Sequence, residues 1–308
     1  MIARSTKLSL SVLIIALTIV GATQFRHSPV PPQESLVLRR VGNDSFNSNP
    51  IGVGAKDERS LKLKPNNAHA DGVAVRQLAD DDAILRVGTF NIHGGKGRDG
   101  RRDLERTARS LEGLDVVGLN EVRGDWFAWQ PDQAAELGRT LKMDSAFAPS
   151  EQIGWFDRFG NGLLSRLELT SVQRIPLPGT QRKRFRNAVL TGIRWNGRVV
   201  RLLTVHVDST CDRVRQLELV SDLFLSLAEP ALLMGDLNTR SNDPTLQRLL
   251  ATSGVVDVLS MAESIERQPE SHIDWILARG LKAVHAEIRD AGASDHPVVR
   301  AALKLDRD

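Results

Sequence analysis

The feature that most constrains this chain is a series of short apolar runs, each leading into a polar residue that can carry chemistry. The run Ile84–Phe90 leads to Asn91, and the run Ala231–Met234 leads to Asp236 two residues later. Short runs of this kind, bounded by turn-forming residues, are typical of strands packed in a core. They outnumber the strong helical patterns, so we expect a mixed, β-rich α/β sandwich rather than a purely parallel doubly wound sheet.

Periodicity along the rest of the chain gives the expected elements. Apolar residues at helical spacing predict helices, and a strand hairpin is indicated at Asn196-Gly197, because this dipeptide favours tight two-residue turns. The expected strands are 84–90, 115–119, 189–193, 199–207, 231–234, 273–277 and 298–305, and the expected helices are 104–111, 137–141, 213–227 and 245–251.

The N-terminal part differs in composition from the rest. Arg4 and Lys7 precede an uncharged apolar run, Leu8–Ala22, which has the layout of a signal peptide and is short against the ~20 apolar residues of a membrane span. We therefore expect residues 1–25 to be a signal peptide or a single-pass anchor. The catalytic domain would then be periplasmic or secreted, or membrane-anchored outside the cytoplasm. Residues 26–83 lack periodicity and are expected to be a flexible linker, and residues 84–308 the catalytic domain.

The composition of the chain excludes several kinds of site and mechanism. Of the 308 residues 41% are apolar, which is enough for a substantial core, and the formal charge of +3 is only a weak hint of anionic partners. Cys211 is the one cysteine, which excludes an intrachain disulfide within this sequence and any cysteine-rich metal site. The sequence has no tyrosine, so no mechanism that needs a phenol is available to it.

Eight polar residues lie at or beside the ends of the expected strands. They are Asn91, Glu121, His206, Asp236, Asn238, Asp274, Asp295 and His296. Taken singly, each has an ordinary explanation as a turn former, a helix cap or a solvated side chain. Taken together, they indicate one site, because strand ends meet along one rim of a packed sheet.

The residue types suit the hydrolysis of a phosphate ester. This reaction needs a hard cation held by carboxylate and amide oxygens, which Glu121 with Asn91 or Asp295 would supply. It also needs a carboxylate that orients or activates water, a role open to Asp236. The two histidines discussed above are candidates for phosphate binding or for protonating the leaving group, with a carboxylate such as Asp274 raising the imidazole pKa. The closely spaced histidines of a zinc hydrolase are not found.

In this order, the motifs resemble those of the endonuclease/exonuclease/phosphatase superfamily. This is the DNase I-like fold that includes abasic-site endonucleases, inositol polyphosphate phosphatases and neutral sphingomyelinases. The matching segments are 89–94, 97–100, 103–106, 115–122, 160–166, 204–206, 235–238, 273–276 and 294–296. Each segment alone is weak evidence for this family, but the ordered set, which covers roughly residues 84–305, is highly specific for it.

The resemblance implies a four-layer α/β/β/α sandwich with its site along one edge. It implies Glu121 as the principal Mg²⁺ ligand beside Asn91, with Mn²⁺ as an alternative ion, and Asp295 assisting the metal. By the same resemblance, Asp236 orients the water, and the phosphate contacts and the carboxylate–imidazole pair are assigned to Asn238, His206, Asp274 and His296. Asn120 stands where the family commonly has Gln.

The substrate stays open between nucleic acid, lipid and small-molecule phosphate esters. A nuclease is expected to have basic and aromatic residues along the rim of its site. The candidates are residues 96–102, residues 181–186, Trp126 and Trp129. A lipid or small-molecule phosphodiesterase fits export and an N-terminal membrane tether equally well. A non-catalytic binding module on the same fold is the third alternative. We expect the chain to be a monomer.

Overall fold

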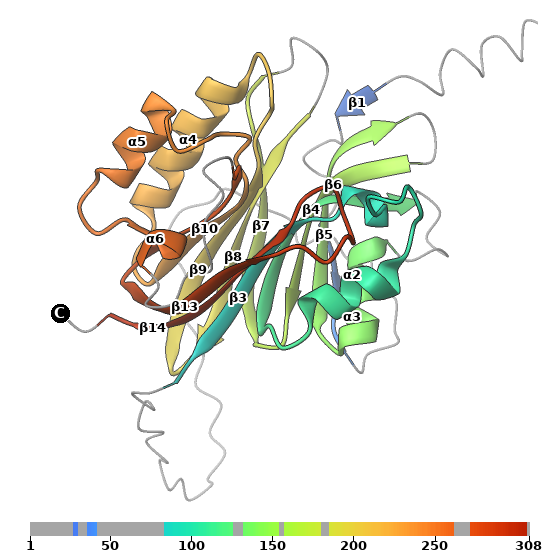
Figure 1. The fold of residues 1–308 in the computed structure, drawn as a ribbon, viewed down its shortest axis with the longest axis horizontal. Coiled ribbons are helices and arrows are strands. Elements are labelled where there is room, and N and C mark those ends of the chain that lie inside the picture. The colour runs from blue at the N-terminus through green and yellow to red at the C-terminus, as the bar shows by residue number, and fades with distance from the viewer. Residues whose placement is uncertain are drawn as a thin grey trace, which may run out of the picture.

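The computed structural model describes residues 27–29, 36–41, 83–125, 132–153, 157–179, 185–261 and 272–306. Two β-sheets pack face to face, and helices cover the outer face of each (Figure 1). This arrangement is the four-layer sandwich expected from the sequence, so the predicted fold class is confirmed.

The first sheet has eight strands in the order β1-β5-β6-β4-β3-β14-β13, with β2 also paired to β5. Only β3 and β4 run parallel among its pairs; the others are antiparallel. Its strands are β1 (His27–Pro29), β2 (Val37–Arg39), β3 (Leu85–Asn91), β4 (Val116–Asp125), β5 (Asp144–Ile153), β6 (Asp157–Ser165), β13 (Leu281–Arg289) and β14 (Val298–Leu305).

The second sheet has six strands in the order β11-β12-β10-β9-β8-β7. Here β9 and β10 are the parallel pair. The predicted hairpin joins β8 to β9, and Asn196 and Gly197 both have positive φ, as its tight turn requires. The strands are β7 (Leu169–Pro176), β8 (Asn187–Trp195), β9 (Arg198–His206), β10 (Ala231–Asp236), β11 (Val256–Asp257) and β12 (Asp274–Arg279).

Three apolar clusters fill the spaces between the four layers. The largest lies between the sheets and includes Val87 and Met234, one from each sheet. A second packs the helices α2 and α3 on the eight-stranded sheet, and a third packs α4 and α5 on the six-stranded sheet. The described helices are η1 (His93–Gly95), α2 (Leu104–Leu111), α3 (Gln133–Leu141), α4 (Arg213–Ser226), α5 (Pro244–Leu250) and α6 (Val258–Met261).

The strand directions explain why the polar strand ends meet. In the parallel pairs β3–β4 and β9–β10, both carboxyl ends lie at the same edge. The strands β12 and β14 run antiparallel to their neighbours β10 and β3, so they begin at that edge. One edge of the sandwich therefore collects the ends of four strands and the starts of two others.

Two parts of the structure differ from the expectation. Within the segment expected to be a linker, β1 and β2 add to the edge strand β5, because unpaired backbone groups at a sheet edge accept short extended segments whatever their side-chain pattern. The strands β5, β6, β7 and β13 were not expected. The predicted leader lies outside the described residues, and among the residues that are described no helix has the length and apolar character to cross a membrane.

Candidate active site

Three of the predicted residues form a straight row across the six-stranded sheet. His206 ends β9, Asp236 ends the neighbouring β10, and Asp274 begins β12; Asp236 is in register with both neighbours. All three side chains are buried. Because strand pairing fixes the backbone on both sides, the spacing of these groups is set by the sheet itself.

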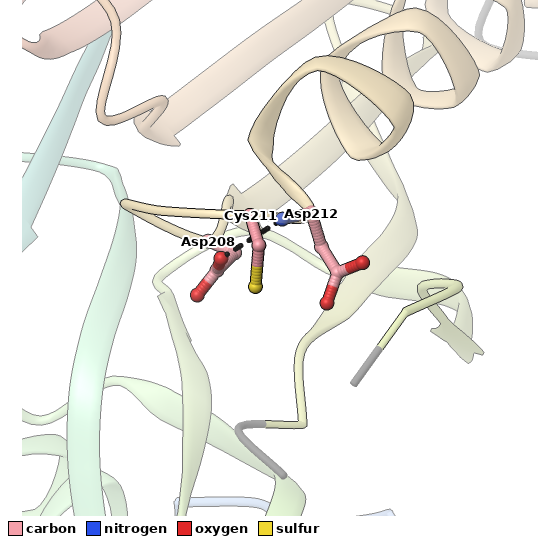
Figure 2. A group of neighbouring side chains, drawn as sticks. All are labelled: Asp208, Cys211 and Asp212. Carbon is pink, nitrogen blue, oxygen red and sulfur yellow. Dashed lines mark hydrogen bonds between the residues drawn. The ribbon is translucent and has the colours of Figure 1, made fainter. Parts of the chain in front are cut away.

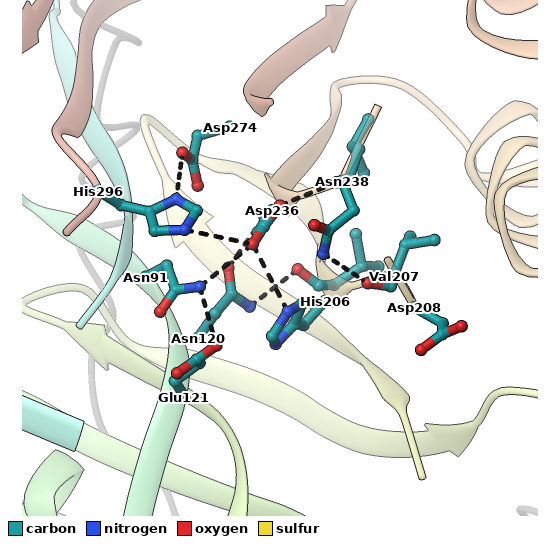
Figure 3. Close-up of polar contacts among 12 residues, drawn as sticks. Asn91, Asn120, Glu121, His206, Val207, Asp208, Asp236, Asn238, Asp274 and His296 are labelled. Atoms are coloured by element: carbon teal, nitrogen blue, oxygen red, sulfur yellow. Dashed lines mark hydrogen bonds and ion pairs between the residues drawn. The ribbon is translucent and has the colours of Figure 1, made fainter. Parts of the chain in front are cut away.

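Asp236 is the centre of the site, as Figure 3 shows. Its Oδ2 atom lies 3.5 Å from Nε2 of His206 and 3.9 Å from Nε2 of His296, and it accepts a hydrogen bond of 3.1 Å from Nδ2 of Asn91. Its Oδ1 atom accepts the backbone N–H of Asn238 at 2.8 Å. Residues from four separate parts of the sequence thus converge on one carboxyl group.

The pKa values of both central groups are raised, which favours the neutral form of Asp236 and the charged form of His296. Burial, together with the negative charge of Asp274, raises the pKa of Asp236 to about 7. Burial disfavours the charged form of His296, but a 2.7 Å hydrogen bond between its Nδ1 and Oδ2 of Asp274, with the surrounding carboxylates, outweighs it and raises the pKa to about 9. Asp236 is therefore suited to exchange a proton near neutral pH, where His296 is an imidazolium.

Glu121 lies beside this centre, on the opposite sheet. It sits where β4 is irregular, with φ +58°, and Asn91 donates a hydrogen bond of 3.3 Å to its Oε1 atom. His93 and Asn238 also have left-handed backbones, with φ +48° each. Non-glycine residues adopt this conformation at an energetic cost, and such residues cluster at functional sites.

A chain of buried asparagines fixes the two sheets to each other at the site. Asn120 accepts the backbone N–H of Asp236 (3.0 Å) and donates both to Oδ1 of Asn161 and to the carbonyl of Val205 (2.8 Å each). Asn161 in turn donates to Asn187 on the second sheet at 2.8 Å. The amide at position 120 thus holds the backbone of the central aspartate.

Asp295 stands apart from the other predicted metal ligands. Its side chain is 56% exposed and pairs with Nδ1 of His93 at 3.3 Å. The groups of ligand type that approach within 4.8 Å of one another here are instead Asp236, Asp274 and His296. The structure thus unites Asn91 and Glu121 with the centre and places Asp295 at its rim.

The donor set fits a hard divalent cation. The Glu121 carboxylate is partly exposed, and with Asn91 beside it the candidate ligand atoms are carboxylate and amide oxygens, without sulfur. Oδ1 of Asp274 is buried and has no hydrogen-bond partner among the described residues. A cation near this edge would offset the cost of holding several carboxylates close together.

Sequence reasoning missed several residues that position the site. Asn161 and Asn187 lie on strands that were not recognised or were expected to begin later, and Ser294, which donates a 2.7 Å hydrogen bond to the backbone carbonyl of Asn91, was taken only as part of a motif. A buried amide beside glycines, as in Gly160-Asn161-Gly162, was the available signal.

The candidate nucleic-acid rim is described only in part. In the basic segment 96–102, Arg98 pairs with Asp290 at 2.8 Å, and Asp99 receives two hydrogen bonds from Arg106. Residues 181–184 and both candidate tryptophans lie outside the described residues. Arg186 and Arg123 both lie over the ring of Phe159, 5.8 Å from its centre.

Comparison with known proteins places this geometry in a family. Residues 88–296 match the model of the endonuclease/exonuclease/phosphatase family. The chain belongs to this family. Endonucleases, exonucleases and phosphatases all hydrolyse phosphate esters, so this is a family of phosphoester hydrolases. No curated protein matches the chain.

Solved structures of the endonuclease/exonuclease/phosphatase family share the fold. The family protein from Beutenbergia cavernae is 26% identical, with 72% of each chain covered and a TM-score of 0.59. A mannosyl-6-phosphatase from Bacteroides thetaiotaomicron is 16% identical (72% of this chain and 100% of that chain, TM-score 0.56). TDP2 of D. rerio, complexed with a single-strand DNA product, is 21% identical (73% and 100%, TM-score 0.53).

Proposed function

We propose that this chain is a divalent-metal-dependent phosphoesterase that hydrolyses a phosphodiester by in-line attack of an activated water. The observation that carries the proposal is the Asp236 carboxyl group, which is 1% exposed and contacted by His206, Asn91 and Asn238. A buried carboxyl group with a pKa of about 7 is matched to accepting a proton from water at neutral pH.

The remaining groups have complementary roles. The His296 imidazolium, held by Asp274, is assigned to hydrogen-bond a phosphoryl oxygen or to give its proton to the leaving oxygen. His206 and Asn238 are assigned to contact the phosphate, and the Asn238 side chain is oriented by a 2.8 Å hydrogen bond to the carbonyl of Val207.

Glu121 and Asn91 are assigned to hold the cation, with Mg²⁺ as the expected ion and Mn²⁺ as the alternative. When bound there, the cation supplies positive charge that offsets the negative charge of the phosphoryl oxygens. Asp295 would assist from the rim, where it also orients His93.

We further propose that the chain acts outside the cytoplasm, as the basic start and apolar run at residues 4–22 indicate. An exported nuclease is the second candidate. It is favoured by Arg123, a half-buried residue of β4 two positions after Glu121, which adds positive charge beside the site.

The test is hydrolysis by the purified full chain of plasmid DNA, single-stranded DNA, RNA, sphingomyelin, a phosphoinositide and bis-p-nitrophenyl phosphate, with Mg²⁺ and with EDTA. We expect Mg²⁺-dependent cleavage of at least one diester, with loss of activity in His296→Gln but not in the exposed control His285→Gln. Preference for the polynucleotides would establish the nuclease. A folded chain that binds Mg²⁺ weakly and cleaves nothing on the panel would favour a binding module instead.

A further inference from the structure

A second cluster of ligand-type side chains lies in the loop between β9 and α4. Asp208, Cys211 and Asp212 each offer one ligand atom, and these atoms all lie within 4.8 Å of one another. Figure 2 shows the three side chains projecting in the same direction from this loop. None of them belongs to the site described above.

Asp212 has a buried carboxylate that does not cap its helix. It occupies the N-cap position of α4, where an aspartate normally accepts a backbone N–H of the first turn, yet its side chain makes no capping hydrogen bond. The residue is only 7% exposed, and within the part of the chain that the structure describes its carboxylate has no hydrogen bond or ion pair. The oxygens of this carboxylate are therefore available to a cation.

The backbone around the cluster is shaped to hold this carboxylate in place. Gly179 has φ +123°, and a Cβ atom at this position would lie 2.3 Å from Cγ of Asp212. Only glycine allows so close an approach. Gly179 therefore packs directly on Asp212 and restricts the directions in which the carboxylate oxygens can turn.

Asp208 provides a second, prepositioned carboxylate. Its Oδ2 atom accepts hydrogen bonds from the backbone and the hydroxyl of Thr210 and from the backbone of Asp212, at 2.9–3.2 Å. Burial alone would raise the pKa of Asp208, but these donors, with the charge of Arg186, hold it below its ordinary value. The Asp208 carboxyl group is thus ionised at neutral pH, and its Oδ1 atom accepts none of these three hydrogen bonds.

We propose that Asp208, Cys211 and Asp212 form a second metal site, which binds a borderline-soft divalent cation such as Zn²⁺. One sulfur and two carboxylate oxygens, completed by water, match the coordination of Zn²⁺ better than that of Mg²⁺, which prefers oxygen alone. On binding, the Cys211 S–H bond breaks, its proton passes to water, and a sulfur–metal bond forms. Cys211 is exposed, so ion and solvent reach it directly.

The test uses Co²⁺ as a spectroscopic probe, added to the full chain carrying Glu121→Gln to weaken the catalytic site. We expect one additional Co²⁺ with a sulfur-to-cobalt charge-transfer band, which Cys211→Ser abolishes. We expect Asp212→Asn to weaken this Co²⁺ binding at least about tenfold, whereas Asp222→Asn, an exposed position on the same helix, leaves it unchanged.

A second measurement does not depend on any variant. In the native full chain, we expect Zn²⁺ to slow the alkylation of Cys211 by iodoacetamide at least about tenfold, because metal coordination occupies the sulfur. Absence of the charge-transfer band, or equal alkylation rates with and without Zn²⁺, would overturn the proposal. Neither readout requires phosphoesterase activity, so the failure of the proposed catalytic function would leave the result unaffected.

Discussion

Replacing Asn120 with leucine tests whether the asparagine chain holds the catalytic centre. The two side chains are similar in size, but leucine removes three hydrogen bonds of 2.8–3.0 Å, to Asp236, Asn161 and Val205. Each buried donor or acceptor left without a partner costs about 1–3 kcal/mol, so the three groups together are expected to lower the free energy of unfolding by at least about 3 kcal/mol. That is a large share of the ~5–15 kcal/mol that stabilises a typical domain.

The same change is expected to reduce activity in the protein that remains folded. The lost hydrogen bond fixes the backbone of Asp236, and a displacement of about 1 Å at a catalytic group can lower the rate about 100-fold. The assay pairs urea denaturation, followed by circular dichroism, with kcat for bis-p-nitrophenyl phosphate measured well below the unfolding midpoint.

The matched control is Asn242→Leu, at an exposed position outside the helices and strands. It should change the unfolding free energy by less than about 0.5 kcal/mol. If Asn120→Leu altered stability by less than about 1 kcal/mol and left kcat unchanged, the asparagine chain would not position the site.

Three further predictions concern other parts of the molecule. Burial opposes ionisation of Asp243, but its hydrogen bond to Arg213 and its capping of α5 lower its pKa. The ionised group therefore stabilises the fold above about pH 3.9, and this effect is lost as pH falls through the folded pKa. In urea denaturation, Asp243→Ala should lower the free energy of unfolding by about 1 kcal/mol at pH 7 and by clearly less at pH 3. Gly235→Ala should destabilise by on the order of 3 kcal/mol in the same assay, because φ is +145° and the new Cβ would lie 1.9 Å from a backbone oxygen of β9. Glu121→Gln should raise the Mg²⁺ concentration for half-maximal activity at least about tenfold, whereas the exposed Glu105→Gln should not.

Much of the sheet arrangement could be predicted from the sequence because the central strands carry continuous or alternating apolar residues. The runs that became β3, β9 and β10 were recognised, and each ends in a residue of the site. The eight candidate residues were selected because strand ends were expected to meet at one edge, and the structure brings all of them except Asp295 to the centre of that edge. The existence of these strands is encoded locally in their apolar runs, whereas the shared edge follows from the directions in which the strands pair.

Other features depend on tertiary contacts that no local pattern records. The strand β7 is largely exposed or half-buried and reads as polar, so its sequence resembles a loop. The strands β1 and β2 form by pairing with β5 rather than through their own side chains. The pairing of Asp295 with His93 likewise joins residues far apart in the sequence, and His93 has a left-handed backbone that no local pattern reveals.

The most direct test of the central claim is hydrolysis of bis-p-nitrophenyl phosphate in ¹⁸O-labelled water by the Mg²⁺-loaded chain and by Asp236→Asn. We expect the label to enter p-nitrophenyl phosphate and not p-nitrophenol, and the variant to be slower by about 100-fold or more, since it lacks the group that accepts the proton of water. Label in p-nitrophenol, or full activity in Asp236→Asn, would show that Asp236 does not activate water for attack on phosphorus.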